Sequence, residues 1–343
     1  MTMEPCPILE NQRREDGVAA STPTAVLGSR PAAAYSIFHE PWWLDIATGG
    51  RWCTAKIMQG TRLIGEMPYA LATRKGLWRV SRLPPLTRSL GPVIEPIGSA
   101  CPDVEFRHHM RVAAHLIDQL PGCDSFFQIF DHRVKDALAF ALRGFGVSAR
   151  YTFHIAPDCT TDEAWTRMSA KTRHAIRHAA AFLTVRDIER PGEFLDFYEA
   201  NLSARSRTNA YGTGVMHELV NAFVERQAGY LLGAYDRHGQ LAGGIGLVWD
   251  CEHMYYLLSS RSATASGGAI SLLVWSAIQD AIKRNLTFDL DGFSNAAAYA
   301  FLRGFGGTLI QRLGVERHGM AYSLARTIRR GLPGANDAFS ASL

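Results

Sequence analysis

Apolar and polar residues alternate at residues 288–291 (FDLD), and this period of two predicts a strand that buries one face. The alanine-rich segment that follows predicts a short helix, capped by Ser294 or Asn295. Glycines at the end of this helix lead into a second predicted strand at residues 308–315. The first strand has two carboxylates at its carboxyl end, the edge where ligands lie in open α/β sheets.

Hydrophobic periodicity and turn residues predict the remaining elements. In the first half of the chain they predict helices from residue 41, at 105–119 and at 136–143, strands at 51–59, 62–73, 126–130 and 147–155, and a proline-rich connection or edge strand at 83–96. In the second half they predict helices at 161–182, 192–203, 215–229 and 269–284, strands at 183–188, 230–235, 241–249 and 254–259, and a segment at 321–330 that closes the domain. The sequence therefore predicts a protein of the α/β (α+β) class.

Part of this pattern occurs twice. Residues 142–146 and 302–306 share the five letters LRGFG, and each copy follows a predicted strand, at residues 127–131 and 288–292. The two offsets agree, since 302 − 142 = 160 and 288 − 127 = 161. A repeated helix end with a repeated strand before it predicts two copies of one fold.

Length and composition are compatible with this duplication. The chain has 343 residues, enough for two domains, and 47% apolar with 20% charged residues is an average globular balance. We expect a flexible leader at 1–30, domains at 31–156 and 157–330, and a flexible tail at 331–343. The net charge of +4 permits a polyanionic partner without requiring one, and the oligomeric state stays open.

The sequence indicates a cytoplasmic protein. It has no apolar run near the roughly 18 residues of a membrane span, and its first 30 residues lack the apolar core of a secretion signal. Six scattered cysteines, none in a CxxC pair, predict free thiols in a reducing compartment. No His cluster accompanies them at zinc-site spacing, so the sequence indicates no metal site.

Two segments are candidates for binding a phosphate-bearing donor. The loop before residues 269–284 offers backbone N–H groups and a helix N-terminus to an anion. Its candidate residues are Ser259, Ser260, Arg261, Ser266, Gly267 and Gly268. The helix at 161–182 has a basic face, formed by Lys171, Arg173 and Arg177, that can contact phosphate or tRNA. The alternatives are a flexible polar loop and a solvated helix face.

Two further groups are candidates for the reaction centre and the acceptor. Asp289 and Asp291 alternate on one strand, so we expect both on the same side, where a carboxylate can accept a proton from an amine. Alternatively, they cap the next helix. Arg205, Arg207 and Tyr211 lie between two helices and either bind an acceptor's carboxylate or phosphate or form a surface loop. No nucleophile with a matching base stands out, so a covalent mechanism is not indicated.

Several of these segments together resemble the Fem-type (FemABX-like) branch of the GNAT acyltransferase superfamily. The segments are residues 171–177 (KTRHAIR), 241–244 (LAGG), 255–260 (YYLLSS), 288–289 (FD) and 301–307 (FLRGFGG). The first half resembles the degenerate partner domain of that branch, opening with FH at 38–39 and WW at 42–43. The resemblance covers residues 35–325 and implies two tandem GNAT-like domains, the second one catalytic. Each would be a mixed, mostly antiparallel sheet flanked by helices.

The resemblance also implies an N-acyltransferase. Such enzymes move an acyl or aminoacyl group from acyl-CoA, acyl carrier protein or aminoacyl-tRNA to an amine on a small molecule or peptide, with no permanently bound cofactor. The amine attacks directly, so catalysis rests on positioning and on polarising the carbonyl group.

The sequence departs from the family pattern in the helix at residues 296–303. Leu302 stands where Fem-type proteins often carry Lys, and we expect Arg303 to stabilise the oxyanion instead. Tyr299, one residue from the acid Tyr of simple GNAT enzymes, is a further catalytic candidate. The alternative is a binding or scaffold protein that kept the fold and lost the chemistry, and Leu302 favours it.

Overall fold

The fold is that of a computed structural model, which describes residues 35–263, 268–293 and 295–330. The predicted leader and tail, together with Ser266 and Gly267, lie outside the described residues. The elements up to residue 156 are a 3-10 helix (Ile37–His39), α1 (Pro41–Thr48), β1 (Trp52–Gln59), β2 (Arg62–Ala70), β3 (Ala72–Arg74), β4 (Trp78–Ser81), β5 (Val93–Ile94), α2 (Pro102–Asp118), β6 (Ser125–Ile129), α3 (Leu138–Ala141) and β7 (Gly146–Ile155).

The later elements follow the predicted order closely. They are α4 (Thr161–Arg167), α5 (Ala170–Ala180), β8 (Thr184–Asp187), α6 (Pro191–Ser203), α7 (Thr213–Glu225), β9 (Gly229–Tyr235), β10 (Leu241–Trp249), β11 (His253–Arg261), α8 (Ala269–Lys283), β12 (Thr287–Gly292), α9 (Ala296–Arg303), β13 (Thr308–His318) and α10 (Met320–Arg330). The predicted helix at 136–143 is shorter, the predicted strand at 62–73 is divided into β2 and β3, and the sequence pattern did not predict β4.

The prediction of one helix over residues 161–182 is wrong, because the chain breaks into α4 and α5 at Ser169. The Ser169 side chain accepts the Thr172 N–H at 3.2 Å and so caps α5, while its own N–H donates to the Gly304 carbonyl at 2.9 Å. Arg173 donates to the Met168 carbonyl at 2.6 Å and satisfies the end of α4. Local capping therefore outweighs the helical periodicity of the segment.

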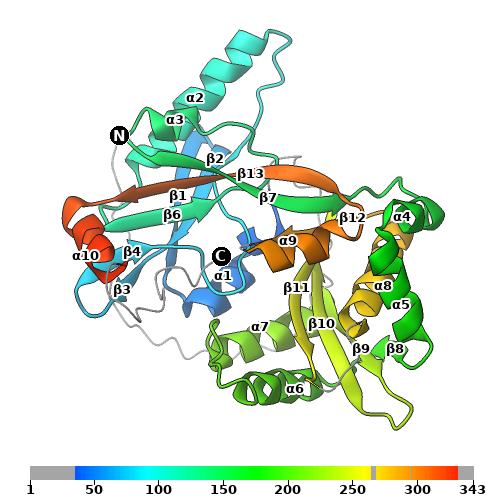
Figure 1. Cartoon of the computed structure of the whole chain (residues 1–343). Coiled ribbons are helices and arrows are strands. Elements are labelled where there is room, and N and C mark those ends of the chain that lie inside the picture. The colour runs from blue at the N-terminus through cyan, green and yellow to red at the C-terminus, as the bar shows by residue number, and fades with distance from the viewer. Residues whose placement is uncertain (1–34, 264–267, 294, 331–343) are drawn as a thin grey trace, which may run out of the picture.

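Ten strands from both halves of the chain form one continuous sheet (Figure 1). Its order is β3-β4-β6-β13-β7-β12-β11-β10-β9-β8, and a separate three-stranded sheet has the order β1-β2-β5. Eight strands of the large sheet, from β3 to β10, are arranged symmetrically about the antiparallel pair β13 and β7, and β9 and β8 extend one side. β6 pairs antiparallel with β13, and β12 pairs antiparallel with β7. The next strands outwards, β4 and β11, run parallel to β6 and β12. The strands after these, β3 and β10, run antiparallel to β4 and β11.

This topology means that the two halves exchange strands. β7 follows β6 in the chain but lies between β13 and β12, and β13 follows β12 but pairs with β6 and β7. A boundary at residue 156 therefore divides the chain without dividing the sheet. The predicted mixed α/β class is confirmed, and the symmetry is what an internal duplication would produce.

Helices cover both faces of the sheet's second-half strands (Figure 1). Leu232 packs with α8 residues on one face, whereas its neighbour Leu231 packs with α6 and α7 residues on the other. α1 lies against α7, and Trp43 of α1 and Phe38 of the preceding 3-10 helix belong to the core cluster that α7 helps to form, so the first residues of the described chain help to cover the second half. Helix α2 packs on β1 and β2.

One cysteine departs from the sequence-based expectation. Cys101, Cys123, Cys159 and Cys251 are free thiols, whereas Cys53 is disulfide-bonded, so the prediction of free thiols is wrong for Cys53. Of the helices in the described part of the chain, none is long and apolar enough to cross a membrane.

Candidate active site

Strands β11 and β12 pair only at their starts. Their parallel register runs from His253↔Thr287 to Tyr255↔Asp289, after which β11 continues to Arg261 without β12 as a ladder partner. β11 also contains a bulge, because Tyr256 and Leu258 oppose consecutive residues of β10 and Leu257 opposes none. A bulge disrupts the ladder and redirects backbone groups, and bulges are over-represented beside active sites.

Arg88, from the connection between β4 and β5, bridges the two diverging strands. Its guanidinium donates to the carbonyl of the bulged Leu257 at 2.5 Å, and its Nε lies 3.0 Å from the Oδ2 of Asp291. Arg88 also donates a hydrogen bond to Tyr211. The side chains of Arg88 and Asp291 are 15% and 19% exposed, so the ion pair is mostly shielded but still reachable from solvent.

Burial and this ion pair set the protonation of the site. Burial alone would lower the pKa of Arg88, but Asp291 and Tyr211 raise it above its ordinary value. Burial raises the pKa of Asp291, and Arg88 opposes part of this shift. Burial also raises the pKa of Tyr256 to about 12. Asp291 is therefore a more basic carboxylate than an exposed one, beside a fixed positive charge.

Asp289 and Asp291 do not form the matched pair that strand alternation predicts. Asp291 has a φ of +67°, and the pairing of β12 with β7 is irregular between Asp289 and Gly292. The two carboxylates consequently contact different partners. Asp289 Oδ1 still accepts the backbone N–H of Asp291 at 2.9 Å, so the two residues remain adjacent.

Asp289 is fully buried and held by side chains of β7 and β13. Thr152 donates to its Oδ1 at 2.5 Å, His154 Nε2 lies 3.1 Å from its Oδ2, and Arg312 forms an ion pair with it. Burial alone would raise the pKa of Asp289, but Arg312, His154 and Thr152 hold it well below its ordinary value. Asp289 therefore stays ionised and holds the surrounding side chains and the Asp291 backbone in place, rather than accepting a proton.

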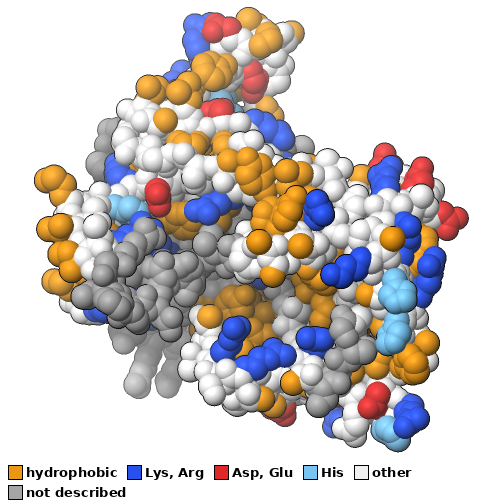
Figure 2. Space-filling model, in the orientation of Figure 1, with side chains coloured by type: hydrophobic (Ala, Val, Ile, Leu, Met, Phe, Trp, Pro, Cys, Tyr) orange, Lys and Arg blue, Asp and Glu red, His pale blue; other side chains and the backbone are white. Residues whose placement is uncertain are grey.

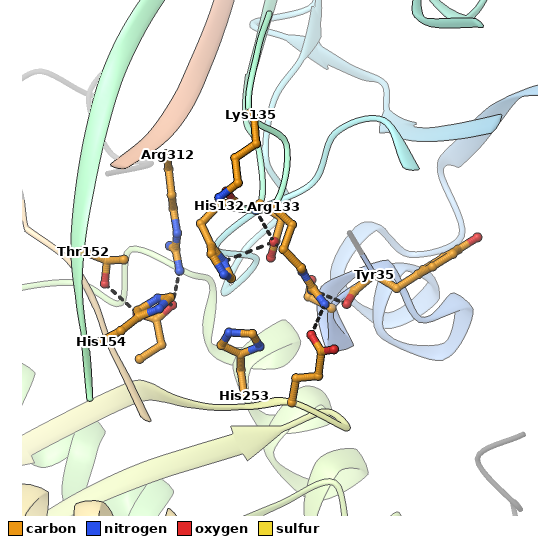
Figure 3. A network of polar contacts seen from close by, with 12 residues as sticks. Tyr35, His132, Arg133, Lys135, Thr152, His154, His253 and Arg312 are labelled. Carbon is orange, nitrogen blue, oxygen red and sulfur yellow. Dashed lines mark hydrogen bonds and ion pairs between the residues drawn. The ribbon is translucent and has the colours of Figure 1, made fainter. Parts of the chain in front are cut away.

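Three imidazoles extend this network away from Asp289 (Figure 3). The figure shows the rings of His132, His154 and His253 turned towards one another, with Arg312 and Arg133 beside them. These residues come from β7, from β11 and from the chain just after β6. They are the candidate metal ligands among the described residues.

Some residues of the candidate donor loop make contacts within the protein and are not available to a ligand. Ser260 is buried, and its hydroxyl accepts a hydrogen bond from Asn201 at 3.2 Å, whereas Ser259 is exposed. Gly268 lies against α5, where an added Cβ would come within 2.3 Å of the Ala175 carbonyl oxygen. Arg261, at the end of β11, accepts a hydrogen bond on its carbonyl from the next candidate, Arg205.

Helix α5 presents only part of its predicted basic face. Lys171 and Arg177 are exposed, and Lys, Arg and His side chains gather over α5 at the right of the molecule (Figure 2). Arg173 is instead tied to the end of α4, and Arg177 lies 5.3 Å above the Trp165 ring. Lys171 and Arg177 thus remain available to a phosphate.

The other predicted residues fall into two groups. Tyr211 contacts Arg88, which in turn pairs with Asp291, whereas Arg207 is exposed to solvent. On α9, Leu302 is buried in the core, and the guanidinium of exposed Arg303 lies 5.5 Å above the Tyr299 ring. Among the contacts of the described residues, Arg303 and Tyr299 meet neither aspartate.

Comparison with known proteins agrees with this architecture. The sequence model of the acetyltransferase (GNAT) domain family matches residues 164–299, which is less than half of the chain. No curated protein matches by sequence. A crystal structure of FemX is similar over 81% of this chain and 91% of its own, with a TM-score of 0.59 and 11% sequence identity.

Two further solved structures are similar at a TM-score of 0.52. One is the C-terminal domain of a putative lysylphosphatidylglycerol synthetase from Agrobacterium fabrum, with 13% identity over 83% of this chain and 90% of that one. The other is a conserved protein of unknown function from Bacteroides thetaiotaomicron, with 10% identity over 80% of this chain and 89% of that one. Residues 164–299 therefore match the GNAT domain family, and the chain has a fold similar to that of FemX.

Proposed function

We propose that this protein is an N-acyltransferase that moves an acyl or aminoacyl group from an activated donor to an amine by direct attack. The observation that carries the proposal is the Arg88–Asp291 pair at the point where β11 and β12 diverge. It combines a partly accessible, basic carboxylate with backbone groups of β11 that lack a β12 partner.

The chemistry follows from these groups. The neutral amine attacks the donor's carbonyl carbon, Asp291 accepts the amine proton, and the carbon–sulfur or carbon–oxygen bond to the carrier breaks. Backbone N–H groups near the Leu257 bulge stabilise the oxyanion that forms on the carbonyl oxygen. Arg88 fixes the position of Asp291, and Tyr211 lies where it can contact the acceptor.

The donor is acyl-CoA, acyl carrier protein or aminoacyl-tRNA, bound at the end of β11 and the start of α8. Exposed Lys171 and Arg177 on α5 support a phosphate-bearing donor. A tRNA donor would make transfer strongly salt-dependent through these side chains, whereas a coenzyme A thioester would make it less so. One of the similar structures is part of a putative lysylphosphatidylglycerol synthetase, and this likeness favours including a lysyl group among the acyl groups tested.

The test measures turnover with each donor class against a mixture of amines, with product detection by mass spectrometry. We expect Asp291→Asn to lower the rate by about 10²–10⁴-fold. The matched control is Asp118→Asn, which removes an exposed carboxylate paired with Arg143 and should leave the rate unchanged. Full activity of Asp291→Asn would refute the assigned site. Stoichiometric binding without turnover of any donor would favour the scaffold alternative, which the buried Leu302 supports.

A further inference from the structure

Three histidines that are far apart in the sequence meet at the seam between the two halves. His132 follows β6, His154 lies on β7 and His253 opens β11. One ring nitrogen from each lies within 4.8 Å of the others. His154 and His253 are buried and His132 is half-buried, so the cluster is largely shielded from water.

Carboxylates contact one ring nitrogen of two of these histidines. His132 Nδ1 lies 3.2 Å from Asp131 Oδ1, and His154 Nε2 lies 3.1 Å from Asp289 Oδ2. Each contact leaves the other ring nitrogen available. A carboxylate behind an imidazole is the usual arrangement in metal sites, because it fixes the tautomer and raises the basicity of the ligand.

The third ring has an unsatisfied polar atom. His253 Nδ1 is buried and has no hydrogen-bond partner among the described residues. The nearest acid, Asp250, lies 3.9 Å away from it, which is too far for a hydrogen bond. Buried polar atoms nearly always have a partner in the protein or an ordered water, so this nitrogen has a place left for a water or an ion.

The charges around the cluster also favour a cation. Two guanidiniums, those of Arg133 and Arg312, and the ammonium of Lys135 face four carboxylates. The carboxylates are Asp131, Asp250, Glu252 and Asp289. The negative charges outnumber the positive ones by one, which favours a bound cation.

We propose that His132, His154 and His253 bind one zinc-like divalent ion, with a fourth position open to water. Imidazole ligands suit zinc, copper and nickel, and zinc–nitrogen bonds of about 2.0–2.1 Å require the nitrogens to be roughly 3.4 Å apart. The nitrogens, which lie within 4.8 Å of one another, therefore move together by up to about 1.4 Å when the ion binds. The site joins strands from both halves of the chain, and this proposal does not depend on the acyl-transfer function.

The test is a titration of the full chain, stripped with a chelator, with Co²⁺ followed by displacement with Zn²⁺. We expect one tight equivalent of Co²⁺ with the visible bands of tetrahedral coordination, and zinc should raise the melting temperature by several degrees. His253→Gln and His132→Ala should each weaken the affinity at least 100-fold. His132 is only half-buried, so this second variant tests the site even if the first does not fold.

The matched control removes an exposed histidine pair on α5. His174 and His178 are exposed on α5, with ring centroids 6.4 Å apart, and form a surface pair that can bind metal weakly. His174→Ala/His178→Ala should keep the tight equivalent. Loss of that equivalent in this control, its survival in His132→Ala, or no tight cobalt binding by the unmodified chain would each overturn the proposal.

Discussion

Replacing Asp289 tests whether the buried network holds the two halves together. Asp289→Asn keeps the shape of the side chain but removes the charge that faces Arg312, whose side chain is 5% exposed. Arg312 Nε already lacks a hydrogen-bond partner among the described residues, so no spare acceptor compensates. Breaking a buried ion pair at one partner costs about 3–5 kcal/mol, and we expect a loss in this range.

An exposed ion pair provides the control. Asp118 and Arg143 are joined at 2.9 Å, but their side chains are 56% and 32% exposed. Solvent screens such a pair, so Asp118→Asn should cost about 0–1 kcal/mol. The free energy of unfolding is measured in urea, with chelator present and with two spectroscopic probes to check for a single transition.

A double mutant separates the ion pair from other effects. Arg312→Met removes the unpaired charge, so Asp289→Asn/Arg312→Met should be more stable than Asp289→Asn alone. The reasoning is refuted if Asp289→Asn costs no more than Asp118→Asn, or if adding Arg312→Met destabilises the protein further.

Three further predictions use other features of the structure. Burial lowers the pKa of His39 to about 4 from 6.5, so the unfolded chain binds a proton that the folded chain rejects. Stability from this residue should fall by roughly 3 kcal/mol as pH drops from 6.5 to 4, and the unfolding of His39→Gln should lose this dependence. If the stability of His39→Gln kept the same pH dependence, this prediction would be wrong. Gly306 and Gly144 share a φ of +76°, but a Cβ would meet backbone oxygen at 2.4 Å only at Gly306. Gly306→Ala should therefore lower the melting temperature more than Gly144→Ala, and equal shifts would contradict this. Arg303→Ala should keep turnover within about threefold, whereas Arg88→Gln should lose about 10²-fold; abolished turnover in Arg303→Ala would restore its oxyanion role.

The repeated five letters show how far the sequence determined the fold. They predict two copies of one fold, and each copy of the five letters lies between corresponding strands of the sheet. Their local structures nevertheless differ. Leu142 is 70% exposed and Leu302 is 4% exposed, and the left-handed glycine is Gly144 in one copy and Gly306 in the other. The same five residues thus adopt different local structures in different tertiary surroundings. One copy follows a four-residue helix, and the other includes the end of an eight-residue helix.

The site could be only half predicted, for a physical reason. Asp291 and Tyr211 are visible in the sequence as polar residues at a strand end and in a link. Arg88 lies in a proline-rich connection with no periodicity, and no local pattern indicates that it reaches β11. His132 and His253 were missed in the same way, because their proximity depends on strand exchange and not on spacing in the chain.

Because the two halves exchange strands, the predicted catalytic half depends on residues of the first half. Residues 157–330 contain Asp289 and Arg312, but Thr152 and His154, which hold Asp289, lie on β7. Without residues 31–156, β12 and β13 would each lose their pairing with β7, and Asp291 would lose Arg88. We therefore expect residues 157–330 produced alone to lack cooperative unfolding and transfer activity, because the first half supplies structural and charged parts of the site. Cooperative unfolding with full turnover by that fragment would contradict this dependence.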